Sequence, residues 1–341
     1  MQQPKVTVII PCRNEAIFIS GVLNNLISQD YPKELLEVFV VDGMSSDKTA
    51  DIIKSYAKRY PFIVYLENEN KIVPYGLNKA IRRSTGEVII RMDAHSLYPE
   101  YYISRLVYHL FSLNADNVGG VWVTVPCNNS TVAFAIAKAS SCSFGIGNAM
   151  YRLGYERITE VDTVPFGCYR KEVFSKIGLF DTDLVRNQDD EFNARLIQNG
   201  GKIYLIPDVQ IRYFARETPK KIIKMFYQYG FFKPLVYQKL KKPATLRQFA
   251  PLLFVVYLLS FWFTVFINNF LFKTCILFFL IYLVLSFFYS ARITIKNKKI
   301  VLLFFLPYIF FLIHFSYGWG YLMGIIRFWI LKKKRRKPLV I

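Results

Sequence analysis

The chain changes character at about residue 247. Before that point it mixes apolar, charged and turn residues as globular domains do, and from Arg247 onward it is dominated by Phe, Leu, Ile and Tyr. Three apolar segments follow, each long enough to cross a bilayer core of roughly 30 Å: about residues 248–267, 270–290 and 300–331. We therefore expect a globular domain over residues 1–235 and a membrane region over residues 236–341 that ends in a basic tail.

The charge of the chain points to membranes. The formal net charge is +20, which fits either a nucleic-acid partner or an anionic membrane surface. Many of the basic residues stand beside the apolar segments, at Lys239–Arg247 and Lys332–Lys337. This location favours lipid headgroups, although the terminal run can also be read as a solvated tail. We expect membrane lipids, and no nucleic acid, as partners.

The first half of the chain alternates short β-branched runs with segments of helical spacing. This alternation predicts an α/β sheet with helical crossovers. The expected strands are Val6–Ile10, Leu36–Val41, Phe62–Leu66 and Glu87–Met92. The expected helices are Ile17–Ser28, a helix that Ser46 or Asp47 caps at its N-terminus, and Tyr75–Arg83.

Polar residues follow these strands at the ends where ligands gather in such sheets. Arg13 and Glu15 follow the first strand, Asp42 follows the second, and Asp93 and His95 follow the fourth. Neither GxGxxG nor GxxxxGK[ST] follows the first strand, so a dinucleotide site and a P-loop are not indicated. Because carboxylates repel phosphate unless a cation lies between them, we expect a divalent metal, Mn²⁺ or Mg²⁺, between these side chains and a diphosphate.

Four motifs occur together in order: VIIPCRNE (Val8–Glu15), VVDGMSSDKT (Val40–Thr49), GEVIIRMDAH (Gly86–His95) and QDDEFNARL (Gln188–Leu196). They resemble the inverting family 2 glycosyltransferases of the GT-A fold, a Rossmann-like nucleotide-diphospho-sugar transferase domain. Within that family the chain looks most like the bacterial exopolysaccharide enzymes of the succinoglycan type. Those enzymes also carry D-A-H where most relatives carry D-x-D.

The resemblance implies a donor site. Pro11 and Arg13 match the loop that lines the nucleotide base, and Asp42 matches the aspartate that bonds the base, usually uracil. Asn78 matches an asparagine near the sugar nucleotide. The full set expected to bind the nucleotide sugar is Pro11, Arg13, Glu15, Asp42, Asn78 and Asp93.

The resemblance also implies the metal site and the catalytic base. Asp93 matches the first aspartate of D-x-D, and His95 stands where the principal metal-ligating aspartate would be, so Asp93 and His95 are the expected metal ligands. Asp189 matches the catalytic base, with Arg195 behind it, and Asp190 is the alternative base. Chemistry needs both parts, because the departing diphosphate gains negative charge while the acceptor hydroxyl must lose a proton.

Two further motifs bear on the acceptor. PFGCYRKEVF, Pro165–Phe174, matches the acceptor-side edge of the sheet, where Gly167 serves close backbone approach or a simple turn. QYGFF, Gln228–Phe232, has phenylalanines where processive synthases carry arginine and tryptophan, which favours one sugar per encounter. Glu217–Lys233 reads as an amphipathic interface helix or as a helix packed on the core.

The expected function is transfer of a sugar, from a UDP-sugar by preference, to a lipid-linked acceptor of the undecaprenyl type in exopolysaccharide or cell-surface glycan synthesis. The alternatives are a polyprenyl-phosphate sugar synthase and a non-catalytic component of a polysaccharide export complex. We expect a multi-pass protein of the inner cell membrane with a cytoplasmic catalytic domain. The positive-inside tendency favours two crossings and a re-entrant or interfacial third segment, because a third full crossing would place Lys332–Lys337 outside.

Overall fold

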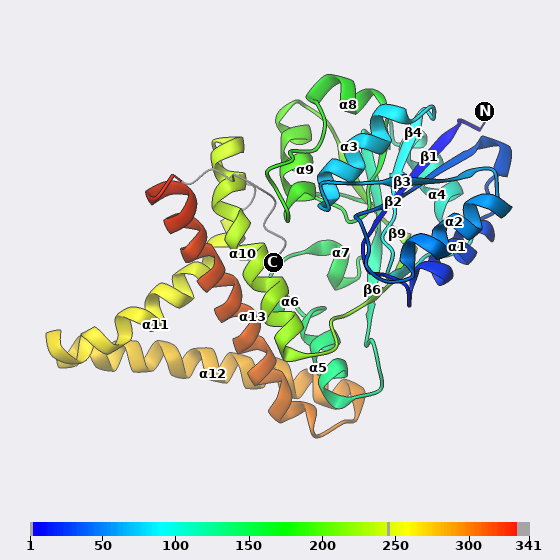
Figure 1. Ribbon diagram of the computed structural model, residues 1–341. Helices are drawn as coiled ribbons and strands as arrows, with labels where there is room; N and C mark the ends of the chain where they lie inside the picture. The colour runs from blue at the N-terminus through cyan, green and yellow to red at the C-terminus, as the bar shows by residue number, and fades with distance from the viewer. Residues whose placement is uncertain (1–2, 244–245, 333–341) are drawn as a thin grey trace. The chain divides into compact units, whose positions relative to one another are not determined.

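The structure, a computed structural model, describes residues 3–243 and 246–332. The described chain divides into two compact units (Figure 1). Unit 1 holds the residues up to Val123 together with Gly154–Tyr213, and unit 2 holds Thr124–Leu153 and the residues from Phe214 onward. This division differs from the boundary expected at residue 235, because residues 124–153 and the helix that follows Phe214 pack with the C-terminal helices.

A mixed nine-stranded sheet runs through unit 1 in the described residues, in the order β3-β2-β1-β4-β8-β6-β9-β5, with β7 paired to β9. Strands β3, β2, β1 and β4 are parallel, while β8 runs antiparallel to both β4 and β6, and β9 runs antiparallel to β5 and β7. The strands are β1 (Val6–Cys12), β2 (Leu36–Asp42), β3 (Ile63–Glu67), β4 (Val88–Arg91), β5 (Ser96–Leu97), β6 (Asn117–Val125), β7 (Thr159–Glu160), β8 (Cys168–Arg170) and β9 (Ile203–Phe214).

The parallel half of the sheet matches the sequence prediction strand by strand. The apolar runs of β1, β2 and β4 are buried on both faces, as expected for parallel strands rich in Val and Ile, whereas the edge strand β3 is partly exposed. Its crossovers are helical, since α1, α2 and α3 connect the four strands in turn. The helices of unit 1 are α1 (Ile19–Ile27), α2 (Thr49–Arg59), α3 (Val73–Arg83), α4 (Tyr102–Ser112), α8 (Glu172–Ile177) and α9 (Gln188–Gln198), with a short 3₁₀ turn η1 (Lys33–Leu35).

The chain order reverses beside β1. From β1 it proceeds to β2 and β3 on one side, and it then returns to place β4 on the other side. Ligands of open α/β sheets bind at such a switch point, outside the carboxyl ends of the strands. The predicted polar residues after β1, β2 and β4 therefore meet at one edge of the sheet.

Unit 2 consists of helices. Three short ones, α5 (Thr131–Ala139), α6 (Ser143–Ile146) and α7 (Met150–Leu153), precede four long ones: α10 (Pro219–Leu240), α11 (Ala250–Ile267), α12 (Asn269–Asn297) and α13 (Leu302–Ile325). A 3₁₀ turn η2 (Leu246–Phe249) precedes α11, and a π-helical turn η3 (Ile326–Ile330) extends α13. The three apolar segments that we expected at about 248–267, 270–290 and 300–331 are thus all helical.

Two of these helical stretches, Asn269–Asn297 and Leu302–Ile330, are long and apolar enough to cross a membrane. They differ in their surroundings, because only 6% of the apolar window of the first is buried inside the protein, against 39% for the second. In Figure 1, α11 and α12 form a hairpin whose turn is at Asn268. The side chains along this hairpin are largely apolar and exposed, for example Phe266 at 88% and Phe270 at 78%.

The third apolar segment is helical through Pro307 and continues as a π-helical turn to Ile330. Whether it is re-entrant stays a prediction. An interfacial position for α13 stays a prediction. The basic tail from residue 333 onward lies outside the described residues.

Helix α13 lies along α10, and glycines make the contact. A Cβ atom at Gly230 of α10 would lie 1.9 Å from the backbone oxygen of Tyr317, and one at Gly320 of α13 would lie 2.2 Å from that of Tyr227. At Gly324 the corresponding distance, to the oxygen of Phe231, is 2.3 Å. Gly320 and Gly324, four residues apart, thus allow the backbones of α10 and α13 to approach closely. Helix α10 therefore packs one face on α13, a helix of the C-terminal apolar region, whereas the sequence predicts the membrane interface or the core of the globular domain for Glu217–Lys233.

Candidate active site

The loops after β1 and β2 are joined by hydrogen bonds between side chains and backbone. The Asn14 amide N–H donates to Ser45 Oγ at 2.8 Å, and the Ser46 N–H donates to Asn14 Oδ1 at 2.9 Å. Asn14 and Met44 both have positive φ, at 56° and 57°, which a non-glycine residue adopts only where its surroundings fix it. The two loops thus form one preorganised rim at the switch point.

Asp42, at the end of β2, holds one loop of this rim in place. It is 2% exposed and accepts hydrogen bonds from the backbone N–H of Ser45 at 3.1 Å and from the Ser45 hydroxyl. The Asp42 carboxylate therefore already fixes the loop that, by the family resemblance, faces the nucleotide base. A carboxylate has about four acceptor positions, so these bonds leave capacity for a ligand.

A second set of bonds ties the start of α1 to the start of α2. The Glu15 N–H donates to Thr49 Oγ1 at 2.8 Å, and Asp47 accepts from the backbone N–H groups of Thr49 at 3.0 Å and Ala16 at 3.2 Å. The N-cap of α2 is Lys48, so the expectation that Ser46 or Asp47 occupies that position is wrong. Asp47 nevertheless satisfies one of the free N–H groups at that helix end.

Arg13 carries an unsatisfied donor. Its Nε is buried and has no hydrogen-bond partner in the described part of the chain. Its side chain packs over Gly43, where an added Cβ would lie 3.3 Å from Arg13 Cβ. A buried donor without a partner costs about 1–3 kcal/mol, so such groups usually serve a ligand or a water. Pro11 is the last residue but one of β1, opposite Val41.

Asp93, His95 and Glu15 form a contact group after β4. His95 Nδ1 lies 3.0 Å from Asp93 Oδ1 and 3.3 Å from Glu15 Oε1. Burial alone would raise the pKa of the Asp93 carboxyl, but His95 and then Arg91 outweigh it and hold that pKa well below its usual range. Asp93 is therefore an anion at neutral pH.

This group fits a divalent cation only in part. Among the described residues, no cluster of three or more His, Cys, Asp or Glu side chains is placed to hold a metal by itself. Asp93 and His95 offer one carboxylate and one imidazole. Mg²⁺ and Mn²⁺ sites with few protein ligands are commonly completed by the phosphate groups of a substrate. The donor set thus suits a cation that arrives with a diphosphate.

Carboxylates also gather around Cys12, the last residue of β1. The pKa of its buried thiol is raised, first by burial and then by the charges of Asp42, Glu15 and Asp93. Side chains from the ends of β1, β2 and β4 are therefore close enough to act on one another electrostatically.

Arg91 connects this space to the predicted base. It is the last residue of β4, its side chain is 10% exposed, and its Nη1 pairs with Asp189 Oδ1. Burial acts to lower the pKa of the Arg91 guanidinium, but Asp189 and then Asp93 outweigh it and raise that pKa. Arg91 therefore stays charged between the two aspartates. We did not single it out from sequence, although an arginine at the end of the apolar run Val88–Ile90 was the available signal.

Asp189 lies in the first turn of α9, as predicted, where the helix dipole favours a negative charge. The helix is fixed on two sides. Asn193, one turn further on, accepts from Asn117 Nδ2 at 3.0 Å and donates to Thr163 Oγ1 at 2.8 Å. Arg195 pairs with Glu191 at 2.7 Å, so its partner is Glu191 and its effect on Asp189 is through the position of the helix. Asp190, the alternative base, lies beside Asp189 in the same turn.

Asn78 has a structural partner. Its Nδ2 donates to the backbone oxygen of Phe180 at 2.8 Å, and its Oδ1 accepts from the Phe180 N–H at 3.0 Å. The side chain is 4% exposed. It ties α3 to the loop that leads towards α9, and its binding of the sugar nucleotide stays a prediction.

The sheet beneath Arg91 is lined with aromatic rings. The Arg91 guanidinium lies 5.8 Å from the ring centre of Phe166, and Trp122 stacks on Tyr213 with centroids 3.9 Å apart. Phe166 has a φ of 49°, a left-handed conformation that is strained for this residue type. At Gly167, which follows, a Cβ would lie 2.5 Å from Asn117 Oδ1, so close packing explains the glycine.

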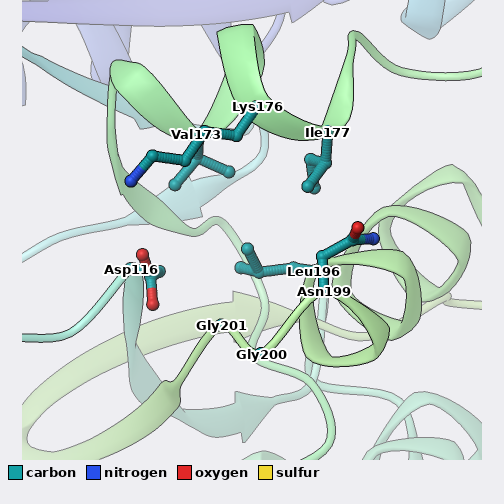
Figure 2. A pocket seen from close by; sticks show the side chains of 8 residues that line it. All are labelled: Asp116, Val173, Lys176, Ile177, Leu196, Asn199, Gly200 and Gly201. Carbon is teal, nitrogen blue, oxygen red and sulfur yellow. The ribbon is translucent and has the colours of Figure 1, made fainter.

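A separate cavity of about 280 Å³ lies at the other end of α9 (Figure 2). Its lining residues are Asp116, Val173, Lys176, Ile177, Leu196, Asn199, Gly200 and Gly201. None of the predicted site residues is among them. Since α9 is roughly 16 Å long at 1.5 Å per residue, this cavity is distinct from the site at Asp189.

Comparison with known proteins decides the family. The family model described as glycosyl transferase family 2 matches residues 7–178. The chain belongs to that family. As a family 2 glycosyltransferase it is a hexosyl-transferring enzyme that acts on nucleotide sugars in glycan synthesis. The expected alternative of a non-catalytic export component is therefore not supported.

Two relatives match over much of their length. One is the dolichyl N-acetyl-alpha-D-glucosaminyl phosphate 3-beta-D-2,3-diacetamido-2,3-dideoxy-beta-D-glucuronosyltransferase of Methanococcus voltae, 29% identical over 94% of this chain and 97% of that protein. The other is the succinoglycan biosynthesis protein ExoA of Rhizobium meliloti, 30% identical over 72% of this chain and 74% of that protein.

Among solved structures, the mannosyltransferase PcManGT from Pyrobaculum calidifontis, in complex with GDP-Man and Mn²⁺, aligns with a TM-score of 0.59. The alignment covers 97% of this chain and 88% of that one at 19% identity, and so it speaks to the fold alone. The fold is that of a GT-A-like domain with two C-terminal apolar helices that are able to span a membrane, as the sequence predicted.

Proposed function

We propose that this glycosyltransferase moves a sugar from a nucleoside diphosphate sugar, by preference a UDP-sugar, to a saccharide carried on a membrane polyprenyl lipid, with inversion at the anomeric carbon. One observation carries the proposal. Arg91, the last residue of β4, pairs with Asp189, the proposed base, and it also interacts electrostatically with Asp93, on the proposed donor side.

The chemistry divides between these groups. Asp189 takes the proton from the acceptor hydroxyl while the oxygen attacks the anomeric carbon. The bond from that carbon to the diphosphate breaks, and the diphosphate leaves with the electron pair. Arg91 orients the Asp189 carboxylate from a buried position. Arg13 and Asp42 hold the nucleotide, with the spare donor of Arg13 and the spare acceptor positions of Asp42.

Asp93 and His95 are the residues that would hold the divalent cation. Bound there, it supplies positive charge against the departing diphosphate. The solved PcManGT complex holds Mn²⁺ together with GDP-Man, which agrees with a divalent cation beside a nucleotide sugar but does not identify the ligands.

The relatives and the apolar helices support the proposed acceptor class. The Methanococcus relative is named for a dolichyl-linked sugar phosphate acceptor, and the Rhizobium relative for succinoglycan synthesis. The α11–α12 hairpin exposes apolar side chains along its length, and basic residues follow α12 at its end. Inserted as two crossings, it would hold the enzyme on the cytoplasmic face of the cell membrane, where lipid-linked acceptors are concentrated.

The test of the base assignment compares Asp189→Asn with Asp190→Asn. Both substitutions remove one charge from the first turn of α9. Because general-base catalysis is worth about 10²–10⁴ in rate, Asp189→Asn should lose that factor in transfer to a lipid-linked saccharide, while Asp190→Asn retains most activity. The rise in unfolding temperature that each sugar of a UDP- and GDP-sugar panel causes should be the same for the two variants. Full activity of Asp189→Asn would refute the assignment, and a loss confined to Asp190→Asn would transfer it to that residue.

A polyprenyl-phosphate sugar synthase is the second candidate function, and the same assay separates it. Bare polyprenyl phosphate should be a poor acceptor compared with the saccharide-bearing lipid. The name of the Methanococcus relative, whose acceptor already carries a sugar, favours the first candidate.

A further inference from the structure

Two lysines from distant parts of unit 2 meet on one aromatic ring. Phe134 and Lys138 are both on α5, and Lys138 Nζ lies 5.2 Å from the centre of the Phe134 ring. Lys299 comes from the turn between α12 and α13, and its Nζ lies 4.2 Å from the centre of the same ring. Cation–π contacts at exposed sites are worth about 0.5–1 kcal/mol each, enough to orient both ammonium groups.

More positive charge surrounds this pair. Lys296, Lys298 and Arg292 are exposed at the C-terminal end of α12. The pKa of Lys138 is lowered, first by burial and then by the charges of Lys296 and Lys299, so these three ammonium groups are close enough to repel one another. Within the described ranges 3–243 and 246–332, none of these five side chains is paired with a carboxylate. The charge is left for a ligand to neutralise.

The position of the cluster indicates the kind of ligand. Helix α12 carries exposed apolar side chains up to Ile295, which is 76% exposed, and the lysines follow at once. Helix α5 buries Ala135, Ile136 and Ala139 in the same core as Leu302, at the start of α13. Figure 1 shows α5 beside the turn between α12 and α13. The lysines therefore lie where an apolar, lipid-facing surface gives way to a charged one, which is the level of the phosphates in a bilayer.

We propose that Lys138, Lys296 and Lys299 form a binding site for the phosphate of an anionic phospholipid headgroup, with Phe134 as its floor. The proposal rests on membrane insertion of the α11–α12 hairpin, and it does not depend on the sugar-transfer chemistry. It assigns to unit 2 a defined headgroup site in addition to the diffuse attraction of a basic protein to an anionic surface.

The experiment uses the purified full chain in a neutral detergent with equal amounts of phosphatidylglycerol and phosphatidylcholine, and native mass spectrometry counts the lipids that stay bound. The wild type should retain phosphatidylglycerol in preference. K138Q/K296Q/K299Q should lose roughly tenfold or more of that preference, because each basic residue near a lipid surface contributes about a factor of five. The control K58Q/K176Q/K202Q removes the same charge from exposed positions in unit 1 and should keep the preference.

Two further measurements keep the proposal testable if the triple variant does not fold. The single variant K296Q removes an exposed charge that makes no ring contact, so it should fold normally and keep only about one fifth to one third of the preference even where the triple variant is unstable. An excess of inorganic phosphate should displace little phosphatidylglycerol. An unchanged preference in both lysine variants, equal loss in the unit 1 control, or full displacement by inorganic phosphate would each overturn the lipid site. The Asp189→Asn comparison addresses the proposed function separately.

Discussion

The two units of this glycosyltransferase hold their elements together by different means. In unit 1 the edge of the sheet at the proposed active site is fixed by charged and amide side chains: Arg91 with Asp189, Arg195 with Glu191, and Asn193 with Asn117. In unit 2 the long helices meet where side chains are absent, at Gly230, Gly320 and Gly324. Directional bonds fix the geometry that catalysis needs, whereas close backbone approach provides the packing on which helices surrounded by lipid depend.

The largest effect is expected from breaking the central ion pair of unit 1. Arg91→Met leaves Asp189 and Asp93 without their shared cation. Removing one partner of a buried pair typically costs about 3–5 kcal/mol of folding free energy. The thermal midpoint and the transfer rate should therefore both fall sharply, whereas Arg91→Lys, which keeps the charge, should lose less of each. A methionine variant as stable as the wild type would show that the pair does not support the fold.

The matching change in unit 2 is Gly230→Val. A Cβ at this position would lie 1.9 Å from the Tyr317 backbone oxygen, so α10 and α13 must separate. Overpacking of this kind costs about 1–3 kcal/mol and occasionally more. The thermal unfolding temperature in detergent should fall. The rate of proteolytic cleavage in the segment that connects α10 to α13 should rise. If the variant unfolds at the wild-type temperature, the glycine contact between α10 and α13 is not present in solution.

Acid should weaken the contribution of Asp93 to the stability of unit 1. The folded-state pKa of Asp93 lies below its unfolded value, so its contribution to stability is present above the unfolded pKa and is lost as pH falls through the folded value. Below about pH 4 this contribution should decline. Unfolding curves of the wild type and Asp93→Asn should accordingly converge only at acid pH. A constant difference down to the lowest pH tested would contradict the lowered pKa of Asp93.

The smallest effect is expected where a glycine has no neighbour. Gly21 lies within α1, and a Cβ there would meet nothing within 4 Å. Gly21→Ala should stabilise unit 1 by about 0.5–1 kcal/mol through helix propensity and a less flexible unfolded chain. It is also the control for Gly230→Val. Destabilisation by this alanine would mean that glycines in this chain matter for reasons other than the space around them.

The sequence predicted the parts of the fold that depend on local pattern. The strands Val6–Cys12, Leu36–Asp42 and Val88–Arg91 are continuous apolar runs, and their order with the intervening helices determines a parallel sheet. The gathering of Asp42, Asp93 and their neighbours followed from the topology, because the carboxyl ends of parallel strands share one edge.

What the sequence did not reveal depends on contacts between distant residues. The antiparallel strands β5 and β7 are two residues each, too short to give a period. The pairing of Arg91 with Asp189 joins residues 98 positions apart, and no local pattern records it. Asn78 matched a ligand motif, yet its hydrogen bonds to Phe180 became visible only in three dimensions.

The contact between α10 and α13 has a consequence for biosynthesis. Because α10 is synthesised well before α13, the backbone of α10 at Gly230 lacks its α13 partner until α11 and α12 have been made. A nascent chain halted after α12 would lack the α13 side chains that share a core with Ile222, Met225 and Phe226. Part of this apolar core would then be open to chaperones and proteases until α13 is made.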